Sequence, residues 1–199
     1  MAVLVGKEAP GFTAQCVNAK GEFESISLDK FRGKEVILYF YPLDFTFVCP
    51  SEIIAFDNAV SKFEERGVQL IGVSVDSHFT HLAWRNTPRE QGGIGAIRYP
   101  LVADLTKNIA RDYDVLTGDG AVAYRGLFLI DKKGVVRHQI VNDLPLGRNV
   151  DEALRMVDAL QFHESHGEVC PAGWNKGKEG MKPNAAGVAS YLAANADKL

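Results

Sequence analysis

Two near-continuous apolar runs stand out in the first half of the chain. Residues 36–41 read VILYFY and residues 68–75 read VQLIGVSV. Short runs rich in β-branched and aromatic residues are typical of strands that are buried on both faces of a sheet. Between them, residues 50–66 repeat apolar side chains at helical spacing and end at Gly67, so this segment is predicted to be a helix.

The second half of the chain continues this alternation and adds a hairpin. Residues 125–131 (RGLFLID) and 135–141 (VVRHQIV) are predicted strands, and the Lys132-Lys133-Gly134 turn between them is typical of a β-hairpin. The other periodicities predict strands at 12–17 and 99–103, a helix at 77–86 capped by Asp76 or Ser77, a helix at 107–113, and a long helix from Val150 to about Leu160.

Buried strands that alternate with helices predict an α/β fold, a sheet covered by helices on both faces. The hairpin near the end makes the central sheet mixed. From Glu164 onward the composition changes, because Gly, Lys, Pro and Asn accumulate as far as Pro183 and an Ala-rich segment follows that is predicted to form a last helix. We therefore predict a globular domain over residues 1–163 and a C-terminal arm over residues 164–199.

Composition narrows the class of protein. The chain has 199 residues, enough for one domain with a sizeable core, and its formal net charge of −3 does not favour a nucleic-acid or anionic-membrane partner. Its start lacks the apolar region of a signal peptide, and no apolar run approaches the roughly 18 residues of a membrane span. We therefore expect a cytoplasmic protein, whose three cysteines do not form a structural disulfide framework.

Cys49 lies between the first predicted strand and the helix after it, in the stretch FTFVCPSE. Pro50 disfavours a helical conformation before it and favours the first helical position, so we expect Cys49 at the cap or in the first turn. Glu52 stands where a capping box places its carboxylate. The helix dipole and free N–H groups there favour a thiolate. A buried structural cysteine is the alternative, but the carboxyl end of a central strand favours chemistry.

The residues from Pro42 to Glu52, PLDFTFVCPSE, resemble the active-site signature of the typical two-cysteine peroxiredoxins, a group that includes the alkyl hydroperoxide reductase C component. This resemblance implies a thioredoxin-like fold. It covers nearly the whole chain, and it continues in SVDSHF from Ser74, HLAW from His81, GGIG from Gly92, RGLF from Arg125, LPLGR from Leu144 and GEVCPAGW from Gly167.

The resemblance implies a thiol-dependent peroxidase that reduces hydrogen peroxide and organic hydroperoxides. Cys49 is then the nucleophile, which becomes a sulfenic acid and needs no metal or organic cofactor. Cys170, in the second V-C-P tripeptide, is then the resolving cysteine of a partner chain, and an intersubunit Cys49–Cys170 disulfide forms. A dithiol protein, either thioredoxin or a dedicated flavoprotein disulfide reductase, reduces that disulfide. Cys16 lies in a strand-like alternation and is interpreted as non-catalytic.

The resemblance also implies roles for the residues around the nucleophile. Thr46 offers its hydroxyl to the peroxide as a hydrogen-bond partner. Arg125 stabilises the thiolate and the charge that develops on oxygen, because its guanidinium is always charged and offers several donors. Pro42 shields the thiolate and shapes the pocket. Glu52 and Arg148 orient Arg125.

The implied assembly is a homodimer, with five dimers in a ring and contacts near residues 77–82. Two other functions stay open beside the peroxidase. The chain could act as an oligomeric holdase chaperone, or as a peroxide-sensing redox relay that passes its oxidation to a partner protein.

Two histidine pairs raise the question of a metal. His163 and His166 precede Cys170 with H-x-x-H-x-x-x-C spacing, and His78 and His81 form a second H-x-x-H pair. A structural zinc site needs four ligands, and neither pair has enough neighbours. We therefore predict no metal site, and both pairs are interpreted as solvated residues at helix ends.

Tyr191-Leu192 departs from the family pattern near the end of the chain. Peroxide-sensitive members carry tyrosine–phenylalanine there, on a tail that packs over the active-site helix and slows its unwinding. The GGIG motif, the other element associated with sensitivity, is present. We therefore expect intermediate sensitivity to overoxidation of the nucleophile.

Overall fold

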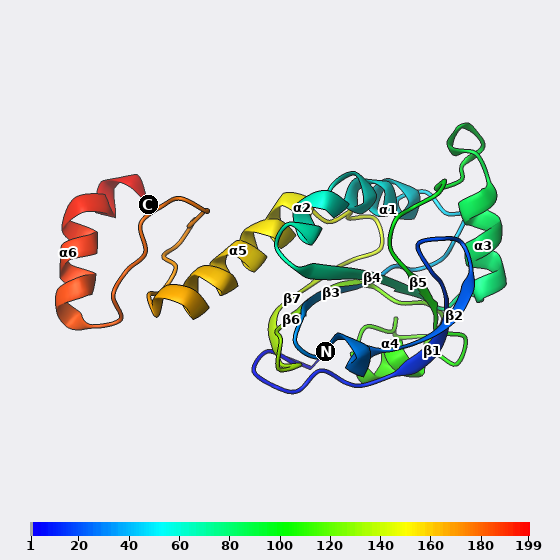
Figure 1. Cartoon of the computed structure of the whole chain (residues 1–199), viewed down its shortest axis with the longest axis horizontal. Helices are drawn as coiled ribbons and strands as arrows, with labels where there is room; N and C mark the ends of the chain where they lie inside the picture. The colour runs from blue at the N-terminus through cyan, green and yellow to red at the C-terminus, as the bar shows by residue number, and fades with distance from the viewer. Residues whose placement is uncertain (1) are drawn as a thin grey trace. The chain divides into compact units, whose positions relative to one another are not determined.

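The computed structural model describes residues 2–199 and divides the chain into two units, residues 1–150 and 151–199. The first unit contains the sheet and the second contains the C-terminal helices (Figure 1). The first unit contains β1 (Thr13–Val17), β2 (Phe23–Ser27), β3 (Glu35–Phe40), α1 (Cys49–Asn58), α2 (Val60–Glu64), β4 (Val68–Ser74), α3 (His78–Asn86), β5 (Leu101–Ala103), α4 (Asn108–Asp112), β6 (Arg125–Ile130) and β7 (Val136–Asn142), with 3-10 turns η1 (Leu28–Phe31) and η2 (Arg89–Gln91).

The strands form one seven-stranded sheet in the order β2-β1-β5-β4-β3-β6-β7. Strand β3 runs parallel to β4 and antiparallel to β6, so the sheet is mixed, as predicted. All six residues of β3 are buried, which explains the VILYFY run. The predicted hairpin is β6 and β7, which pair antiparallel with Arg125 opposite Asn142.

Helices cover both faces of this sheet, with α1 and α2 on one face and α4 on the other (Figure 1). The core on one side gathers apolar residues from several strands and from α4, including Phe40, Val73, Ile109 and Phe128. On the other side, the ring of Tyr39 in β3 stacks on Phe56 of α1 with centroids 4.6 Å apart. The apolar face of α1 therefore fixes this helix on the central strand.

Most predicted elements of the first unit lie close to their observed positions, with two differences. The single helix predicted over 50–66 is two helices, because the chain leaves helical geometry at Ala59 (φ −96°, ψ 1°). Strand β2 was not predicted, since three of its five residues are exposed and it pairs only with β1 at the sheet edge. Ser77 caps α3, as one of the two predicted alternatives, and accepts a hydrogen bond from the Thr80 N–H.

The second unit contains α5 (Val150–His166), α6 (Ala185–Asn195) and the 3-10 turn η3 (Ala196–Lys198). Helix α5 is longer than predicted and includes the first residues of the predicted arm. The arm then returns along α5, because Arg155 donates to the Trp174 carbonyl (3.0 Å) and the rings of Phe162 and Trp174 lie 4.9 Å apart. The Ala-rich segment is helical, as predicted.

Candidate active site

The first unit places Cys49 where a buried strand gives way to a helix. Strand β3 ends at Phe40, the loop 41–48 follows, and Cys49 is the first residue of α1, as the sequence predicted. Phe45 in this loop has a positive φ of 53°, a conformation uncommon for residues other than glycine. The side chain of Cys49 is fully buried. Its sulfur therefore meets protein groups rather than bulk water.

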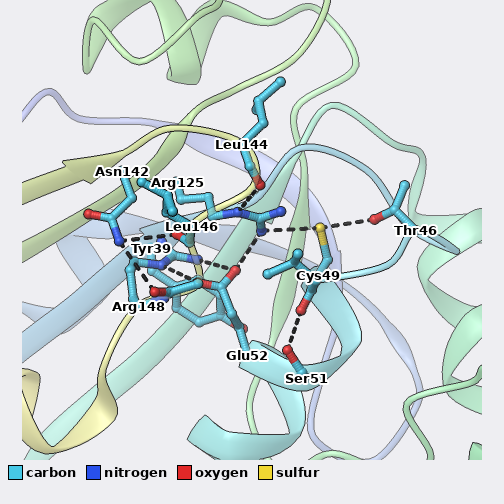
Figure 2. Close-up of polar contacts among 12 residues, drawn as sticks. Tyr39, Thr46, Cys49, Ser51, Glu52, Arg125, Asn142, Leu144, Leu146 and Arg148 are labelled. Carbon is cyan, nitrogen blue, oxygen red and sulfur yellow. Dashed lines mark hydrogen bonds and ion pairs between the residues drawn. The ribbon is translucent and has the colours of Figure 1, made fainter.

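Two hydrogen-bond donors face the sulfur (Figure 2). The Thr46 hydroxyl lies 3.0 Å from Sγ, and Nη1 of Arg125 lies 3.4 Å from it. The same hydroxyl is 2.8 Å from the Leu43 carbonyl, but it has only one proton to donate. Hydrogen bonds to charged acceptors are the stronger kind, so a thiolate draws that proton towards sulfur.

Glu52 connects this pair of donors to a second guanidinium. Its Oε2 accepts from Nη1 of Arg125 (2.7 Å) and Nη2 of Arg148 (3.0 Å), and its Oε1 accepts from Nε and the backbone N–H of Arg148 (2.8 Å each). Glu52 therefore does not close a capping box with residue 49. The α1 N-cap is Val48, which makes no side-chain cap hydrogen bond. The carboxylate faces inward because two buried cations require a counter-charge.

The three charged groups around Cys49 do not balance one another. Arg125 and Arg148 contribute two positive charges and Glu52 one negative charge, and the side chains of all three are almost completely buried. Burial pushes the pKa of Glu52 upward, but Arg148, its hydrogen bonds and Arg125 outweigh it, so the pKa lies below its ordinary value. The carboxylate is thus ionised. One positive charge of these three groups therefore remains uncompensated beside the sulfur of Cys49.

Backbone carbonyls hold the two guanidinium groups in place. Nε of Arg125 donates to the Leu144 carbonyl (2.7 Å), and Nη1 of Arg148 donates to the carbonyls of Phe40 (2.8 Å) and Gly126 (2.5 Å). The Arg148 guanidinium also lies 5.0 Å from the centroid of the Tyr39 ring, a cation–π distance. Arg125 is therefore oriented by groups from α1 and from the loop after β7.

The structure brings together five of the seven site residues that the sequence predicted. Pro42 is also buried at the start of the same loop, and its shielding role stays a prediction. Cys170 lies in the second unit and is half-buried, with its Sγ 3.4 Å from the Ala159 carbonyl. Burial raises the pKa of the Cys170 thiol, and the charge of Arg155 lowers it in part.

Cys16 has the burial expected of a packing residue. It is fully buried in β1, and burial, together with the charge of Glu24, raises the pKa of its thiol to about 11 while Lys30 opposes the shift. A thiol with such a pKa is almost entirely protonated near neutral pH and is a poor nucleophile. This agrees with its interpretation as non-catalytic.

A buried polar network under the loop 41–48 was missed by the sequence analysis. The Tyr41 hydroxyl donates to Oδ1 of Asp44 (2.8 Å), and Nδ1 of His81 lies 2.7 Å from Oδ2 of the same carboxylate. The interpretation of His81 as a solvated residue is wrong, because it is fully buried. The one sequence signal for its burial was its place between Phe79 and Trp84 in a predicted helix. The network fixes the loop that carries Thr46.

Within the described residues, no helix is long and apolar enough to cross a membrane. Across the same residues, the structure groups no three His, Cys, Asp or Glu side chains as metal ligands. The predicted histidine pairs make other contacts. His163 Nδ1 lies 2.8 Å from the Glu168 carbonyl, and the His166 ring stacks on Phe162.

Comparison with known proteins agrees with this geometry. The sequence pattern of the AhpC/TSA family matches residues 5–139, and that of the C-terminal domain of 1-Cys peroxiredoxin matches residues 159–193. The chain belongs to the AhpC/TSA family of peroxiredoxins. It is 59% identical to alkyl hydroperoxide reductase C of Helicobacter pylori over 199 residues, covering 99% of this chain and 100% of the relative. It is 56% identical to mouse peroxiredoxin-2 over 189 residues, covering 95% of each chain.

Solved structures show the same relationship. The reduced 2-Cys peroxiredoxin of Plasmodium vivax matches with a TM-score of 0.94 and 55% identity, covering 96% of this chain and 100% of that one. The predicted thioredoxin-like α/β fold is therefore confirmed, and so is the resemblance to the two-cysteine peroxiredoxins. The protein is a thiol-dependent peroxidase, an oxidoreductase that takes a peroxide as substrate and a thiol as reductant.

Proposed function

We propose that Cys49 is the nucleophile of this peroxidase. The observation that supports the proposal most directly is the pair of donors, Thr46 and Arg125, that face its buried sulfur. The thiolate attacks one oxygen of hydrogen peroxide or an organic hydroperoxide. An S–O bond forms, the O–O bond breaks, and the leaving oxygen takes up a proton as water or an alcohol. Sulfur is oxidised to a sulfenic acid and the peroxide is reduced.

The neighbouring residues have distinct proposed roles in this step. The Thr46 hydroxyl and the Arg125 guanidinium bind the peroxide and stabilise the charge that leaves on oxygen. Glu52 and Arg148 orient Arg125, as their hydrogen bonds support. Pro42 limits access of water to the thiolate. No group beyond the side chains and the peroxide is required for the electron balance.

Cys170 is the proposed resolving residue. Its thiolate attacks the sulfenic sulfur of Cys49 in a partner chain, an S–S bond forms, and the hydroxyl leaves as water. A dithiol protein, thioredoxin or a flavoprotein disulfide reductase, then reduces the intersubunit disulfide by exchange. We also propose that the cycle runs in the cytoplasm, a compartment that keeps such dithiols reduced. Cell fractionation with antibody detection tests the location.

The proposed assembly is a homodimer that forms a pentamer of dimers. An exposed aromatic cluster at the start of α3 supports contacts near residues 77–82. The rings of Phe23 and Phe79 lie 5.1 Å apart, and His78 packs against both. Phe79 keeps 63% of its surface exposed in the single chain, as a residue covered by another copy would. Analytical ultracentrifugation of wild type and Phe79→Glu tests the ring, which the charged variant is expected to dissociate.

The decisive experiment on the mechanism is a non-reducing gel after mild peroxide treatment. Wild type is expected to form a disulfide-linked dimer, and both Cys49→Ser and Cys170→Ser should abolish it. Cys16→Ser is the matched control and should leave the dimer intact, because Cys16 is buried in β1. A wild-type chain that stays monomeric on the gel while it consumes peroxide would contradict the disulfide step.

The same variants separate the two alternative functions. A holdase keeps its protection of unfolding client proteins in Cys49→Ser, whereas peroxide consumption is lost. A redox relay forms mixed disulfides between this chain and a partner protein in preference to the Cys49–Cys170 bond. Trapping with Cys170→Ser followed by mass spectrometry distinguishes these products.

A further inference from the structure

The proposed Cys49–Cys170 disulfide requires α1 to open. The Cys49 side chain is fully buried at the start of that helix, so a second sulfur cannot approach it along the S–S axis while the first turn is intact. Local opening has a free-energy cost that depends on the contacts holding the opened residues. The contacts along α1 therefore determine how much of the helix opens and how fast.

These contacts are uneven along the helix. The turn at Cys49 contains Pro50, which has no backbone N–H, and its N-cap Val48 provides no side-chain cap. Beyond Glu52, a second set of contacts holds the helix from one side. The Tyr99 hydroxyl donates to the Ile53 carbonyl (2.7 Å), and Asp57, near the end of α1, is almost fully buried in a cluster of arginines.

Asp57 joins α1 to the chain on both sides of the loop at residues 92–95. Its Oδ1 accepts from the backbone N–H (2.8 Å) and Nε (3.2 Å) of Arg98, which follows that loop. Its backbone carbonyl also accepts from the Arg98 guanidinium. Its Oδ2 lies 3.8 Å from Nη2 of Arg89, which precedes the loop and donates to the Ile94 carbonyl (3.2 Å).

The loop itself has little freedom to follow a moving helix. The Trp84 indole N–H donates to the Gly92 carbonyl (2.8 Å), and a Cβ on Gly93 would overlap the Thr87 carbonyl. The loop is thus fixed to the end of α3, and Asp57 is fixed to the residues flanking the loop. Through one buried carboxylate, the second half of α1 is attached to a rigid support.

We propose that Asp57 is a positioning residue that anchors the second half of α1 to the segments flanking the loop 92–95, and so confines the opening that exposes Cys49 to the first turn of the helix. This inference rests on the proposed disulfide step. Asp57 touches neither the peroxide nor the sulfur. It acts by limiting the motion that follows sulfenic acid formation.

The test compares Asp57→Ala with wild type in two measurements. In reduced protein, hydrogen exchange of the peptide containing residues 53–58 should become faster in the variant. After one equivalent of peroxide, quenched-flow mass spectrometry should show the Cys49–Cys170 disulfide forming about 3- to 10-fold faster, the factor expected for the net loss of one typical intramolecular hydrogen bond. The sulfenic acid should form at the wild-type rate in the variant. A general disturbance of the site would slow this step as well.

Graded and control variants sharpen the result. Asp57→Asn keeps an acceptor for the Arg98 N–H, and Arg98→Met keeps that backbone contact and the Arg89 pair, so both should lie between Asp57→Ala and wild type. Glu24→Gln breaks a comparable but exposed ion pair with Lys30 and should change neither measurement. Ile109→Ala in α4, across the sheet from α1, destabilises the core and should not accelerate the disulfide (Figure 1).

Unchanged exchange at 53–58 and an unchanged disulfide rate in folded Asp57→Ala would overturn the proposal. So would equal acceleration in Ile109→Ala, since that would show general destabilisation to be the cause. If Asp57→Ala does not fold, Asp57→Asn and Arg98→Met decide by the same criteria. If wild type forms no Cys49–Cys170 disulfide, the proposed disulfide step is wrong. The hydrogen-exchange measurement then still tests whether Asp57 anchors the second half of α1.

Discussion

Nη1 of Arg125 donates to Glu52 at 2.7 Å and lies 3.4 Å from the sulfur of Cys49. One nitrogen atom therefore couples the carboxylate that orients the guanidinium to the proposed nucleophile. The site depends on the shape of the guanidinium as well as its charge, because Nε donates to the Leu144 carbonyl (2.7 Å) and so fixes Nη1, whereas a lysine ammonium has only one nitrogen.

Arg125→Lys is accordingly expected to lower the second-order rate of peroxide reduction by about 100-fold or more, the loss typical of one positioned donor to a developing charge. A competition assay against a reference peroxidase measures this rate. Arg111→Lys, an exposed change in α4, is the control and should react at the wild-type rate. Near-wild-type activity in Arg125→Lys would show that charge alone suffices.

Thr46→Val should separate the hydroxyl from the bulk of the side chain. The substitution removes the donor at 3.0 Å from Sγ while keeping the branched shape. Loss of a hydrogen bond to a charged group predicts a decrease of about 10- to 100-fold in the rate of sulfenic acid formation. Thr46→Ser retains the hydroxyl and should keep most of the activity. Stopped-flow measurement of both variants checks the prediction, and similar losses in the two would contradict it.

Glu52→Gln is expected to change the pH dependence of stability. The pKa of Glu52 is lowered in the folded protein, so its ionised form stabilises the fold above the unfolded-state pKa of about 4.3, and this contribution is lost as pH falls towards the folded pKa. The variant should be less stable at pH 7 by about 3 kcal/mol, because it leaves two buried guanidinium groups without a counter-charge.

Urea unfolding at pH 7 and pH 4 measures this effect. The difference between wild type and Glu52→Gln should shrink at the lower pH, since the unfolded wild-type chain then takes up a proton at Glu52 more readily than the folded chain does. Lys30→Gln removes an exposed ion pair between Lys30 of η1 and Glu24 of β2 and provides the control. A difference that is constant with pH would contradict the assigned charge.

The thiol of Cys170 should react slowly as a nucleophile, because its pKa is raised in these surroundings. Burial raises its pKa and Arg155 opposes that shift, so removing the guanidinium should raise the pKa further. In a Cys49→Ser background, Arg155→Ala should therefore slow alkylation of Cys170 by iodoacetamide at pH 8. Cys16 does not compete, because its pKa is raised to about 11. Arg155→Lys keeps the charge and should react nearly as wild type, and faster alkylation in Arg155→Ala would indicate that access dominates.

Overoxidation of Cys49 should be intermediate, as the Tyr191-Leu192 pair predicts. Wild type should remain free of sulfinic acid near one equivalent of peroxide and accumulate it in excess. Leu192→Phe should lower the peroxide excess that is needed. Mass spectrometry across a peroxide titration provides the measurement, with exposed Val188→Ile in the same helix as control. Prompt sulfinic acid in wild type near stoichiometric peroxide would refute the expectation.

The elements that the sequence predicted well are those whose pattern is local. Strand β3 was predicted from a run of consecutive apolar residues, and all six of its residues are buried. Helix α3 was predicted from its periodicity and from Ser77 as one of two possible caps. The elements predicted poorly depend on distant partners. Strand β2 forms because its backbone pairs with β1, and its own side chains are largely exposed and give no strand pattern.

The same division holds at the site. The sequence alone located Cys49 at a strand–helix junction and identified the residues that resemble a peroxidase pocket. The local position of Glu52 suggested a cap, whereas the resemblance implied that it orients Arg125. The fold turns its carboxylate towards Arg148, 96 residues away. The sequence could not show that His81 is buried against Asp44.

The physical reason is that periodicity and capping are encoded within a few residues, whereas the partner of a buried charge is set by packing. Desolvation makes an unpaired buried polar or charged group costly, so Glu52 and His81 pair with the polar groups that the fold brings beside them. The sequence determined the cysteine proposed as nucleophile, the order of most elements and the class of chemistry. The tertiary structure decided which charges surround the sulfur and how α1 is held.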